Sequence, residues 1–197
     1  MSQNTPPRIG VLAIQGDYAA HASALSESGA EPCEIRNPHE LTEIDGLILP
    51  GGESTTMLKF LESRGIFRAL EEFCANKPVF GTCAGAILLA REVRNPPQQS
   101  LGVLDAVVER NAYGRQIDSA ILTAETSLPG GPLEMVFIRA PRIAAIGPEV
   151  EALAYRDGAP TLVRQGTVMA ATFHPELSAD RRVHRMFVEL VTGRRAR

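Results

Sequence analysis

The stretch Pro78-Val-Phe-Gly-Thr-Cys-Ala-Gly-Ala-Ile-Leu-Leu-Ala-Arg91 joins a short apolar run to a helix-like run through a glycine-flanked turn. Residues 78–81 predict a strand, and residues 84–91 predict a helix. Between them, Gly81-Thr82-Cys83-Ala84-Gly85 has the form G-x-nucleophile-x-G. A nucleophile on such a turn has a strained backbone, which small neighbours on both sides permit. The sequence therefore predicts a strand, turn and helix unit that directs Cys83 out of the end of a sheet.

Short apolar runs and helix-like runs alternate through the rest of the first half of the chain. Asp17 is the expected N-cap of the first helix, and Gly29 is its expected end. Because strands that alternate with helices form parallel sheets covered on both faces, this order predicts a doubly wound α/β arrangement. Ligands of such sheets bind at the carboxyl ends of the strands. The expected strands are residues 8–14, 32–36 and 45–49, and the expected helices are residues 18–28 and 54–76, the second interrupted near Gly65.

The second half of the chain is mainly strand-like, with one helix at its end. We expect strands at residues 104–109, 117–123, 134–138, 143–146, 151–156 and 161–172, and a helix at residues 180–192. There is no internal repeat and no low-complexity linker. The expected fold is α/β, with a mixed, mostly parallel sheet flanked by helices, in a single domain over residues 1–197.

Composition excludes several classes of protein. The chain has 197 residues, of which 44% are hydrophobic and 22% charged, so it is neither collagenous nor disordered. Its net charge of −3 does not indicate a nucleic-acid or membrane surface. Three widely spaced cysteines predict neither a disulfide framework nor a metal site. Without a signal peptide or an apolar run long enough to span a membrane, a cytoplasmic location is expected.

A cysteine nucleophile needs a base, and His174 is the best placed of the four histidines. It follows the apolar run at residues 168–173, at the end of an expected strand. In an extended segment, residues two apart share a face, so Glu176 can accept the second ring N–H of His174. A surface turn at residues 174–176 is the alternative. The other histidines, at positions 21, 39 and 184, are expected in packing or surface roles.

The loop Pro50-Gly-Gly-Glu-Ser-Thr55 also follows an expected strand. Its two glycines leave backbone N–H groups accessible, so the loop can supply an oxyanion donor opposite the N–H of Ala84. A phosphate-binding loop is the rival, but the G-x-x-x-x-G-K-[ST] spacing is missing. A turn capped by Ser54 or Thr55 is compatible with the oxyanion role.

Together these pieces resemble a known family. Residues 50–55, Gly-Thr-Cys-Ala-Gly at 81–85 and His-Pro-Glu-Leu at 174–177 are similar to motifs of the triad-type class I glutamine amidotransferases, which have a flavodoxin-like three-layer fold. Gln15-Gly16 with His21, residues 108–118 and residues 137–141 resemble, more narrowly, the glutaminase subunits of pyridoxal 5'-phosphate synthase. Many members carry Glu where this chain has Ala20, so contacts of that helix with a partner are expected to differ.

The resemblance implies hydrolysis of L-glutamine to L-glutamate and ammonia. The ammonia would pass to a (β/α)8-barrel synthase subunit, in an assembly of twelve plus twelve subunits, for synthesis of pyridoxal 5'-phosphate. No cofactor and no metal is implied. Arg115 is a weaker candidate than Arg110 for binding the substrate carboxylate. By motif, the catalytic residues would be Cys83, His174 and Glu176, the glutamine-binding residues Gly52, Glu53, Ser54, Arg110, Ile138 and Arg139, the oxyanion donors Gly52 and Ala84, and the residue of partner-dependent activation Gln15.

Two other function classes fit the sequence less well. A cysteine peptidase or stress-response protein with an elbow cysteine would lack the arginine site and the pairing of Cys83 with His174. A non-catalytic interaction subunit would most simply have lost Cys83, His174 or Glu176, and all three are present.

Overall fold

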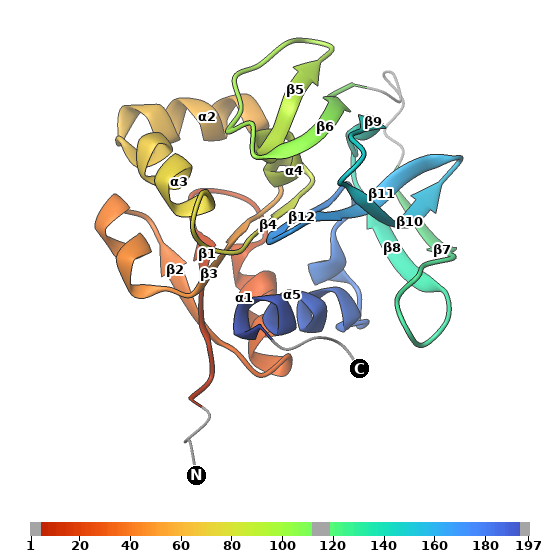
Figure 1. Cartoon of the computed structure of the whole chain (residues 1–197), viewed down its shortest axis with the longest axis horizontal. Helices are drawn as coiled ribbons and strands as arrows, with labels where there is room; N and C mark the ends of the chain where they lie inside the picture. Colours follow the sequence, from red (N-terminus) through yellow and green to blue (C-terminus); the bar gives the residue numbers. More distant parts are fainter. Residues whose placement is uncertain (1–4, 112–118, 194–197) are drawn as a thin grey trace.

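The computed structural model describes residues 5–111 and 119–193, and its centre is a seven-stranded mixed sheet (Figure 1). The strand order is β10-β11-β12-β4-β3-β1-β2. The pairs from β12 to β2 are parallel, whereas β11 is antiparallel to both of its neighbours. The expected mixed, mostly parallel sheet is therefore confirmed. The strands are β1 (Arg8–Leu12), β2 (Glu31–Ile35), β3 (Gly46–Leu49), β4 (Val79–Thr82), β10 (Glu151–Arg156), β11 (Ala159–Gln165) and β12 (Val168–Ala171).

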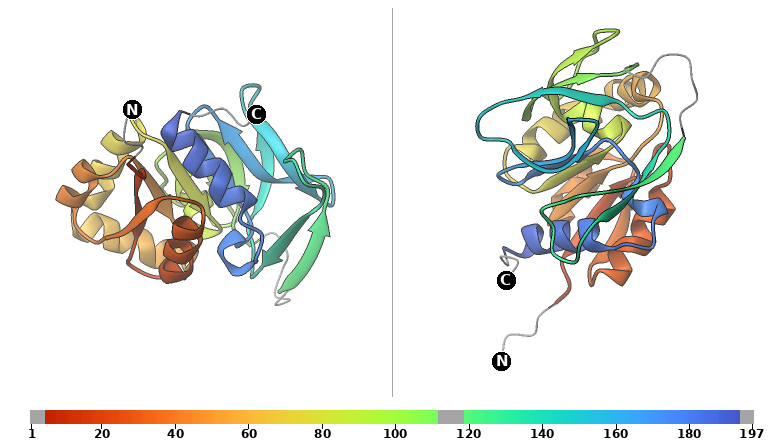
Figure 2. Two further views of the ribbon diagram at one scale, coloured as in Figure 1. Left: turned by 90° about the horizontal axis from the view of Figure 1, so that it is seen from below. Right: turned by 90° about the vertical axis from the view of Figure 1, so that its right-hand side faces the viewer.

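Helices cover both faces of this sheet. On one face lie α2 (Ser54–Ser63), α3 (Ile66–Cys74) and α4 (Ala84–Leu89), and on the other lie α1 (Tyr18–Glu27) and α5 (Arg182–Thr192). Figure 2 shows α5 running beside α1. Because side chains alternate along a strand, each central strand contributes to both cores. Leu47 and Leu49 of β3 join the first core, whereas Ile48 joins the second.

Two smaller sheets extend from the edge of the main one. One contains β5 (Ala90–Arg94), β6 (Leu104–Glu109) and β9 (Arg142–Ile146), and the other is the hairpin of β7 (Ala120–Ala124) and β8 (Leu133–Phe137). Two short 3₁₀ helices, η1 (Pro38–Glu43) and η2 (Pro175–Leu177), complete the fold. Within the described ranges, no helix has the length and apolar character of a membrane span.

Several expected elements have different bounds in the structure. The helix predicted for residues 84–91 ends at Leu89, because Ala90–Arg94 pairs with β6 as strand β5. The run at residues 161–172 is two strands, separated by the turn at Gly166. The break predicted near Gly65 is confirmed, since Gly65 has φ +67° between α2 and α3. Part of the strand expected at residues 117–123 lies outside the described residues.

The fold brings four chain segments to one edge of the sheet. Because β12, β4, β3 and β1 are adjacent and parallel, the segments that follow them emerge at the same edge. These segments carry His174, Cys83, Gly52 and Gln15, respectively. A site built from distant parts of the sequence is thus a consequence of strand order.

Candidate active site

Cys83 lies on a strained turn between β4 and α4. Its backbone has φ 49° and ψ −103°, a region that residues with a side chain rarely adopt. The turn is held by a hydrogen bond of 2.8 Å from Cys83 N to Ala171 O of β12. A Cβ atom at Gly85 would lie 1.9 Å from Leu49 O, so only glycine permits this close packing against β3. The turn therefore fixes the position of the thiol with the sheet itself.

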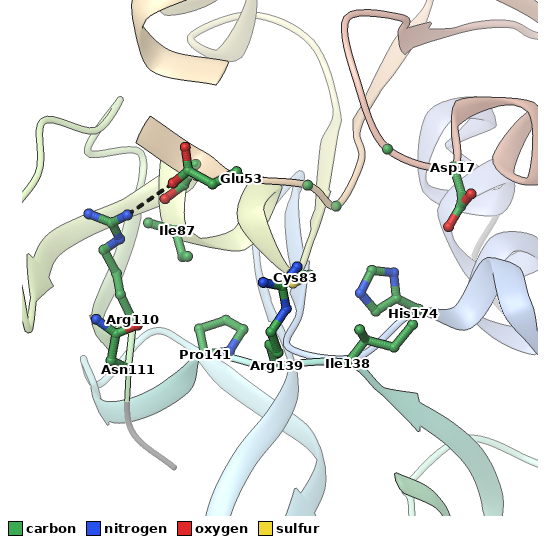
Figure 3. A pocket seen from close by; sticks show the side chains of 14 residues that line it. Asp17, Glu53, Cys83, Ile87, Arg110, Asn111, Ile138, Arg139, Pro141 and His174 are labelled. Carbon is green, nitrogen blue, oxygen red and sulfur yellow. Dashed lines mark hydrogen bonds and ion pairs between the residues drawn. The ribbon is translucent and has the colours of Figure 1, made fainter. Parts of the chain in front are cut away.

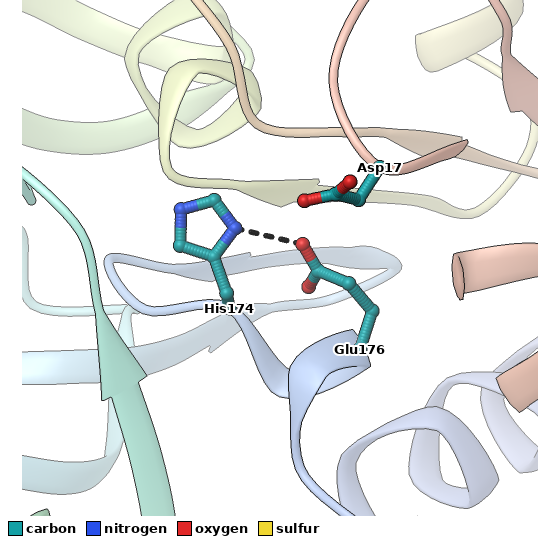
Figure 4. Close-up of side chains that lie close together, drawn as sticks. All are labelled: Asp17, His174 and Glu176. Carbon is teal, nitrogen blue, oxygen red and sulfur yellow. Dashed lines mark hydrogen bonds and ion pairs between the residues drawn. The ribbon is translucent and has the colours of Figure 1, made fainter. Parts of the chain in front are cut away.

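His174 and Glu176 form a buried pair beside the cysteine. His174 Nδ1 lies 2.7 Å from Glu176 Oε1, as Figure 4 shows. The backbone N–H of His174 donates to Val136 O of β8 at 2.8 Å, which fixes the main chain from which the imidazole projects. The expected pairing is present, but its predicted cause was wrong. Residues 175–177 form the 3₁₀ helix η2 with Pro175 at its start, rather than an extended segment.

The surroundings of His174 favour its charged form. Burial opposes a charge on the imidazole, but hydrogen bonds with Cys83 and Glu176, together with their negative charges, outweigh burial and raise the pKa of His174 to about 10. An imidazolium beside a thiolate is a usual way to activate a cysteine nucleophile. Cys83, His174 and Glu176 are thus arranged as a nucleophile, a proton carrier and the group that orients it.

The glycine loop after β3 packs against both His174 and Gln15. A Cβ atom at Gly51 would lie 2.5 Å from His174 Cε1, and one at Gly52 would lie 2.8 Å from Gln15 Nε2. Gln15 Nε2 also donates to Glu53 O at 2.6 Å. Gly52 has φ +139°, which favours glycine. The side chain of Gln15 therefore covers the loop that was predicted to supply an oxyanion donor.

Glu53, rather than Ser54 or Thr55, caps helix α2. Its carboxylate accepts hydrogen bonds from Thr55 N at 3.0 Å and from Thr56 N at 2.7 Å. The Thr56 hydroxyl also donates to it at 2.7 Å, and this bond is the main reason that the pKa of Glu53 falls to about 2. Ser54 instead donates its hydroxyl to Gln98 Oε1 at 2.9 Å. The predicted cap was wrong because a longer carboxylate accepts both free N–H groups at once.

A pocket opens above Cys83 and contains most of the predicted site residues (Figure 3). Arg110 Nη2 donates to Thr55 Oγ1 at 2.7 Å and lies 3.3 Å from Glu53 Oε1, so the loop orients this guanidinium. Arg115 lies outside the described residues. Gln15, Ala84 and Glu176 are not among the residues that line it. The lining consists of Gly16, Asp17, Gly51, Gly52, Glu53, Ser54, Cys83, Ile87, Arg110, Asn111, Ile138, Arg139, Pro141 and His174.

Sequence reasoning missed three residues near the triad. Asp17 makes no side-chain capping hydrogen bond. Its carboxylate lies beside the His174 ring and the Glu176 carboxylate, with one ligand atom of each within 4.8 Å of the others (Figure 4). His21 and His184 are completely buried, and His21 contacts Glu176. The only signal in the sequence was the position of His21 six residues after Gln15.

Comparisons with known proteins agree with this geometry. The model of the SNO glutamine amidotransferase family matches residues 11–193. A protein of Koribacter versatilis named pyridoxal 5'-phosphate synthase subunit PdxT is 60% identical over 184 residues, which cover 93% of this chain and 95% of the relative. Its namesake from Solibacter usitatus is 52% identical over 187 residues, covering 92% and 97% of the two chains.

A solved structure gives the same assignment. The crystal structure described as that of a glutamine amidotransferase superposes with a TM-score of 0.87 at 47% identity, covering 93% of this chain and 98% of the other. The similarity to this structure and the match to the family model both extend over nearly the whole sequence. The chain therefore belongs to the SNO glutamine amidotransferase family.

Proposed function

We propose that this chain hydrolyses L-glutamine to L-glutamate and ammonia, and that residues 1–197 form a single glutaminase domain. The observation that carries the proposal is the position of Cys83. Its strained turn places the thiol in the lining of the pocket, together with the His174 imidazole, which Glu176 holds at 2.7 Å. Membership of a glutamine amidotransferase family supports the choice of substrate.

The reaction divides into two steps that share one proton carrier. The Cys83 thiolate attacks the side-chain amide carbon of glutamine, and the N–H groups of Gly52 and Ala84 stabilise the resulting oxyanion. His174 donates its proton to the departing nitrogen, so that ammonia leaves and a glutamyl thioester remains. His174 then accepts a proton from water as the water attacks the thioester, and glutamate and the thiolate are released. No cofactor and no metal is part of this cycle.

The rim of the pocket fits the rest of the substrate. An arginine can bind the α-carboxylate of glutamine through charge-assisted hydrogen bonds. Arg110 and Arg139 both line the pocket, and Arg110 is oriented by Thr55 and Glu53. The remaining glutamine-binding residues of the proposal are Gly52, Glu53, Ser54 and Ile138, which line the same pocket.

The proposed partner is a synthase subunit that uses the ammonia to make pyridoxal 5'-phosphate. The names of the two relatives support this choice. We further propose that the partner is a (β/α)8 barrel in an assembly of twelve plus twelve subunits, that Gln15 takes part in activation by the partner, and that both subunits are cytoplasmic. The free thiols of Cys33, Cys74 and Cys83 are compatible with a reducing compartment.

The test is ammonia release from L-glutamine, with and without the synthase subunit of the same organism. We expect activity that rises with the partner and is abolished in Cys83→Ala. Cys33→Ala is the matched control and should retain wild-type activity, because Cys33 lies on β2, away from the pocket. Activity that depends on Cys83 but not on the partner would indicate a different amidotransferase. No hydrolysis under either condition would refute the proposal.

A further inference from the structure

A second polar cluster lies behind the triad, on the side of Glu176 away from His174. We call it the histidine cluster, and it consists of His21 on α1, Thr82 on β4 and His184 on α5. All three side chains are inaccessible to solvent. His21 Nε2 lies 3.1 Å from Thr82 Oγ1, and His21 Nδ1 lies 3.0 Å from His184 Nε2. The proposed mechanism uses none of these groups.

The cluster meets the triad at the second oxygen of Glu176. Oε1 contacts His174, whereas Oε2 has no well-formed hydrogen bond from any residue that the structure describes. His21 Nε2 lies 3.3 Å from Oε2. A buried carboxylate oxygen almost always has a donor, since leaving it without one costs free energy. His21 is the group placed to be that donor.

The proton on His21 can be assigned from its neighbours. Burial lowers the pKa of His21 well below its ordinary value, so the ring is neutral and carries one N–H. A proton on Nε2 faces the carboxylate and the Thr82 hydroxyl, whereas a proton on Nδ1 would direct the Nε2 lone pair at the negative charge of Glu176. Electrostatics therefore favours the tautomer with the proton on Nε2.

His184 gives an independent argument for the same tautomer. Its Nδ1 atom has no hydrogen-bond partner among the described residues. If that atom carried the proton, a buried N–H would be unpaired, which costs more than a bare lone pair. When His184 carries its proton on its own Nε2, it donates to His21 Nδ1. The single proton of His21 is then on its Nε2 atom, which becomes the donor.

We infer that His21 is a positioning residue for the triad. Its Nε2–H donates to Glu176 Oε2 and Thr82 Oγ1, while the Nε2–H of His184 holds His21 in the required tautomer. The inference rests on the proposed function. The last torsion of a glutamate side chain has a broad energy minimum, so one anchored oxygen leaves the carboxylate plane free to turn. Anchoring both oxygens fixes the plane, and the plane fixes the direction of the His174 ring.

Three substitutions of His21 separate positioning from packing. In His21→Gln, the side-chain amide nitrogen reaches the place of Nε2 and can still donate to Glu176. In His21→Asn, the shorter side chain reaches only the place of Nδ1. His21→Leu removes both polar atoms but fills the space. The control is His39→Asn, because His39 is an exposed histidine on η1.

The main measurement is the rate at which iodoacetamide alkylates Cys83 as a function of pH, followed by mass spectrometry of the peptide that contains Cys83. This readout needs neither glutamine nor the partner, so it tests the inference even if the proposed function fails. In His21→Leu and His21→Asn we expect the profile to move by about one unit toward higher pH, because a misdirected Glu176 supports the imidazolium and thiolate pair less well. In His21→Gln and the control it should stay near that of wild type.

Steady-state ammonia release with the synthase subunit and thermal unfolding complete the experiment. In the leucine and asparagine variants we expect kcat to fall about tenfold to hundredfold, with KM changed less than about twofold. Folded leucine and asparagine variants with the wild-type profile and kcat would overturn the inference. So would a glutamine variant as impaired as the leucine variant, since that result indicates packing alone. If His21→Leu does not fold, the glutamine and asparagine variants decide between these outcomes.

Discussion

Glu176 is a single buried carboxylate whose two oxygens face two different imidazoles. One oxygen lies 2.7 Å from His174 Nδ1, and the other lies 3.3 Å from His21 Nε2. A carboxylate can accept from both rings, which makes charge as well as shape important at this position. Its role can therefore be tested with a substitution that preserves the shape.

Glu176→Gln should leave the fold intact and remove most of the activity. The amide keeps the size of the side chain, but it loses the negative charge that favours protonated His174, and its NH₂ group must face one of the two rings. We expect kcat for partner-stimulated ammonia release to fall at least about a hundredfold, as when the orienting carboxylate of a triad is replaced by an amide. Glu149→Gln, at an exposed glutamate in the turn after β9, is the control. A Glu176→Gln enzyme within a few fold of wild type would remove Glu176 from the triad.

Gln15 connects the segment after β1 to the glycine loop after β3, at residues 50–55. Its side chain covers Gly52 and donates to Glu53 O at 2.6 Å, so its removal frees the loop from this contact. In Gln15→Ala we expect the stimulation of ammonia release by the synthase subunit to fall about tenfold. Gln99→Ala, at an exposed glutamine, should behave as wild type. If the stimulation is unchanged in Gln15→Ala, this residue has no part in activation.

At the scale of elements, helix α2 begins at a residue that also belongs to the pocket. Glu53 accepts hydrogen bonds from Thr55 N and Thr56 N, and its main chain is held by Gln15. In Glu53→Ala the free energy of unfolding should fall by about 1 kcal/mol, the usual cost of losing an N-cap. Urea unfolding at pH 7 measures this change, with Glu62→Ala on the exposed face of α2 as the control.

The same cap predicts that the loss of unfolding free energy in Glu53→Ala depends on pH. Because hydrogen bonds lower the pKa of Glu53 to about 2 in the folded chain, against 4.5 for a free glutamate, the folded state favours the ionised form. The stabilisation is complete above pH 4.5 and is lost as the pH falls toward 2. The difference between wild type and Glu53→Ala should shrink across this window. A difference that is constant from pH 5 to pH 3 would show that the carboxylate charge does not matter.

The central strands and the breaks between helices could be predicted from the sequence, because local patterns determine them. Leu47, Ile48 and Leu49 form a continuous apolar run, as expected for a strand buried on both faces. Gly65, with φ +67°, separates α2 from α3. By contrast, Ala90–Arg94 forms a strand only because β6 is available as a partner. Such pairing between distant segments cannot be read from a short window of sequence.

The site was predictable where one motif contains the whole interaction. The turn at Cys83 has glycine on both sides, so it could be expected. The contact of His174 with Glu176 was expected from an extended segment, but the 3₁₀ helix η2 produces it. His21 and His184 are 163 residues apart, and each is surrounded by ordinary helical sequence. Only the packing of α1 against α5 and η2 brings them to Glu176. Their burial, which makes them neutral donors, is a property of the tertiary structure.

For the whole molecule, the histidine cluster predicts acid sensitivity of the fold. Burial lowers the pKa of His184 to about 4 and that of His21 well below 6.5. The unfolded chain, with ordinary histidines, therefore binds more protons than the folded chain between about pH 4 and pH 6.5. The contribution of these two histidines to stability therefore rises with pH in this window, is complete above about pH 6.5 and is lost progressively below it.

The slope of stability against pH can be measured directly. Each neutral buried histidine contributes about 1.4 kcal/mol per pH unit to the slope of the free energy of unfolding. On acidification, His21 and His184 together should therefore lower this free energy about twice as steeply as one such histidine would. His184→Gln keeps a donor toward His21 Nδ1 but cannot titrate, and urea unfolding between pH 5 and pH 6 should therefore show a smaller slope by about 1.4 kcal/mol per unit. His39→Asn is the control, because it replaces an exposed histidine on η1 outside the histidine cluster, and it should leave the wild-type slope. Equal slopes in wild type and His184→Gln would mean that His184 is protonated in the folded protein, which would also remove the tautomer argument for His21.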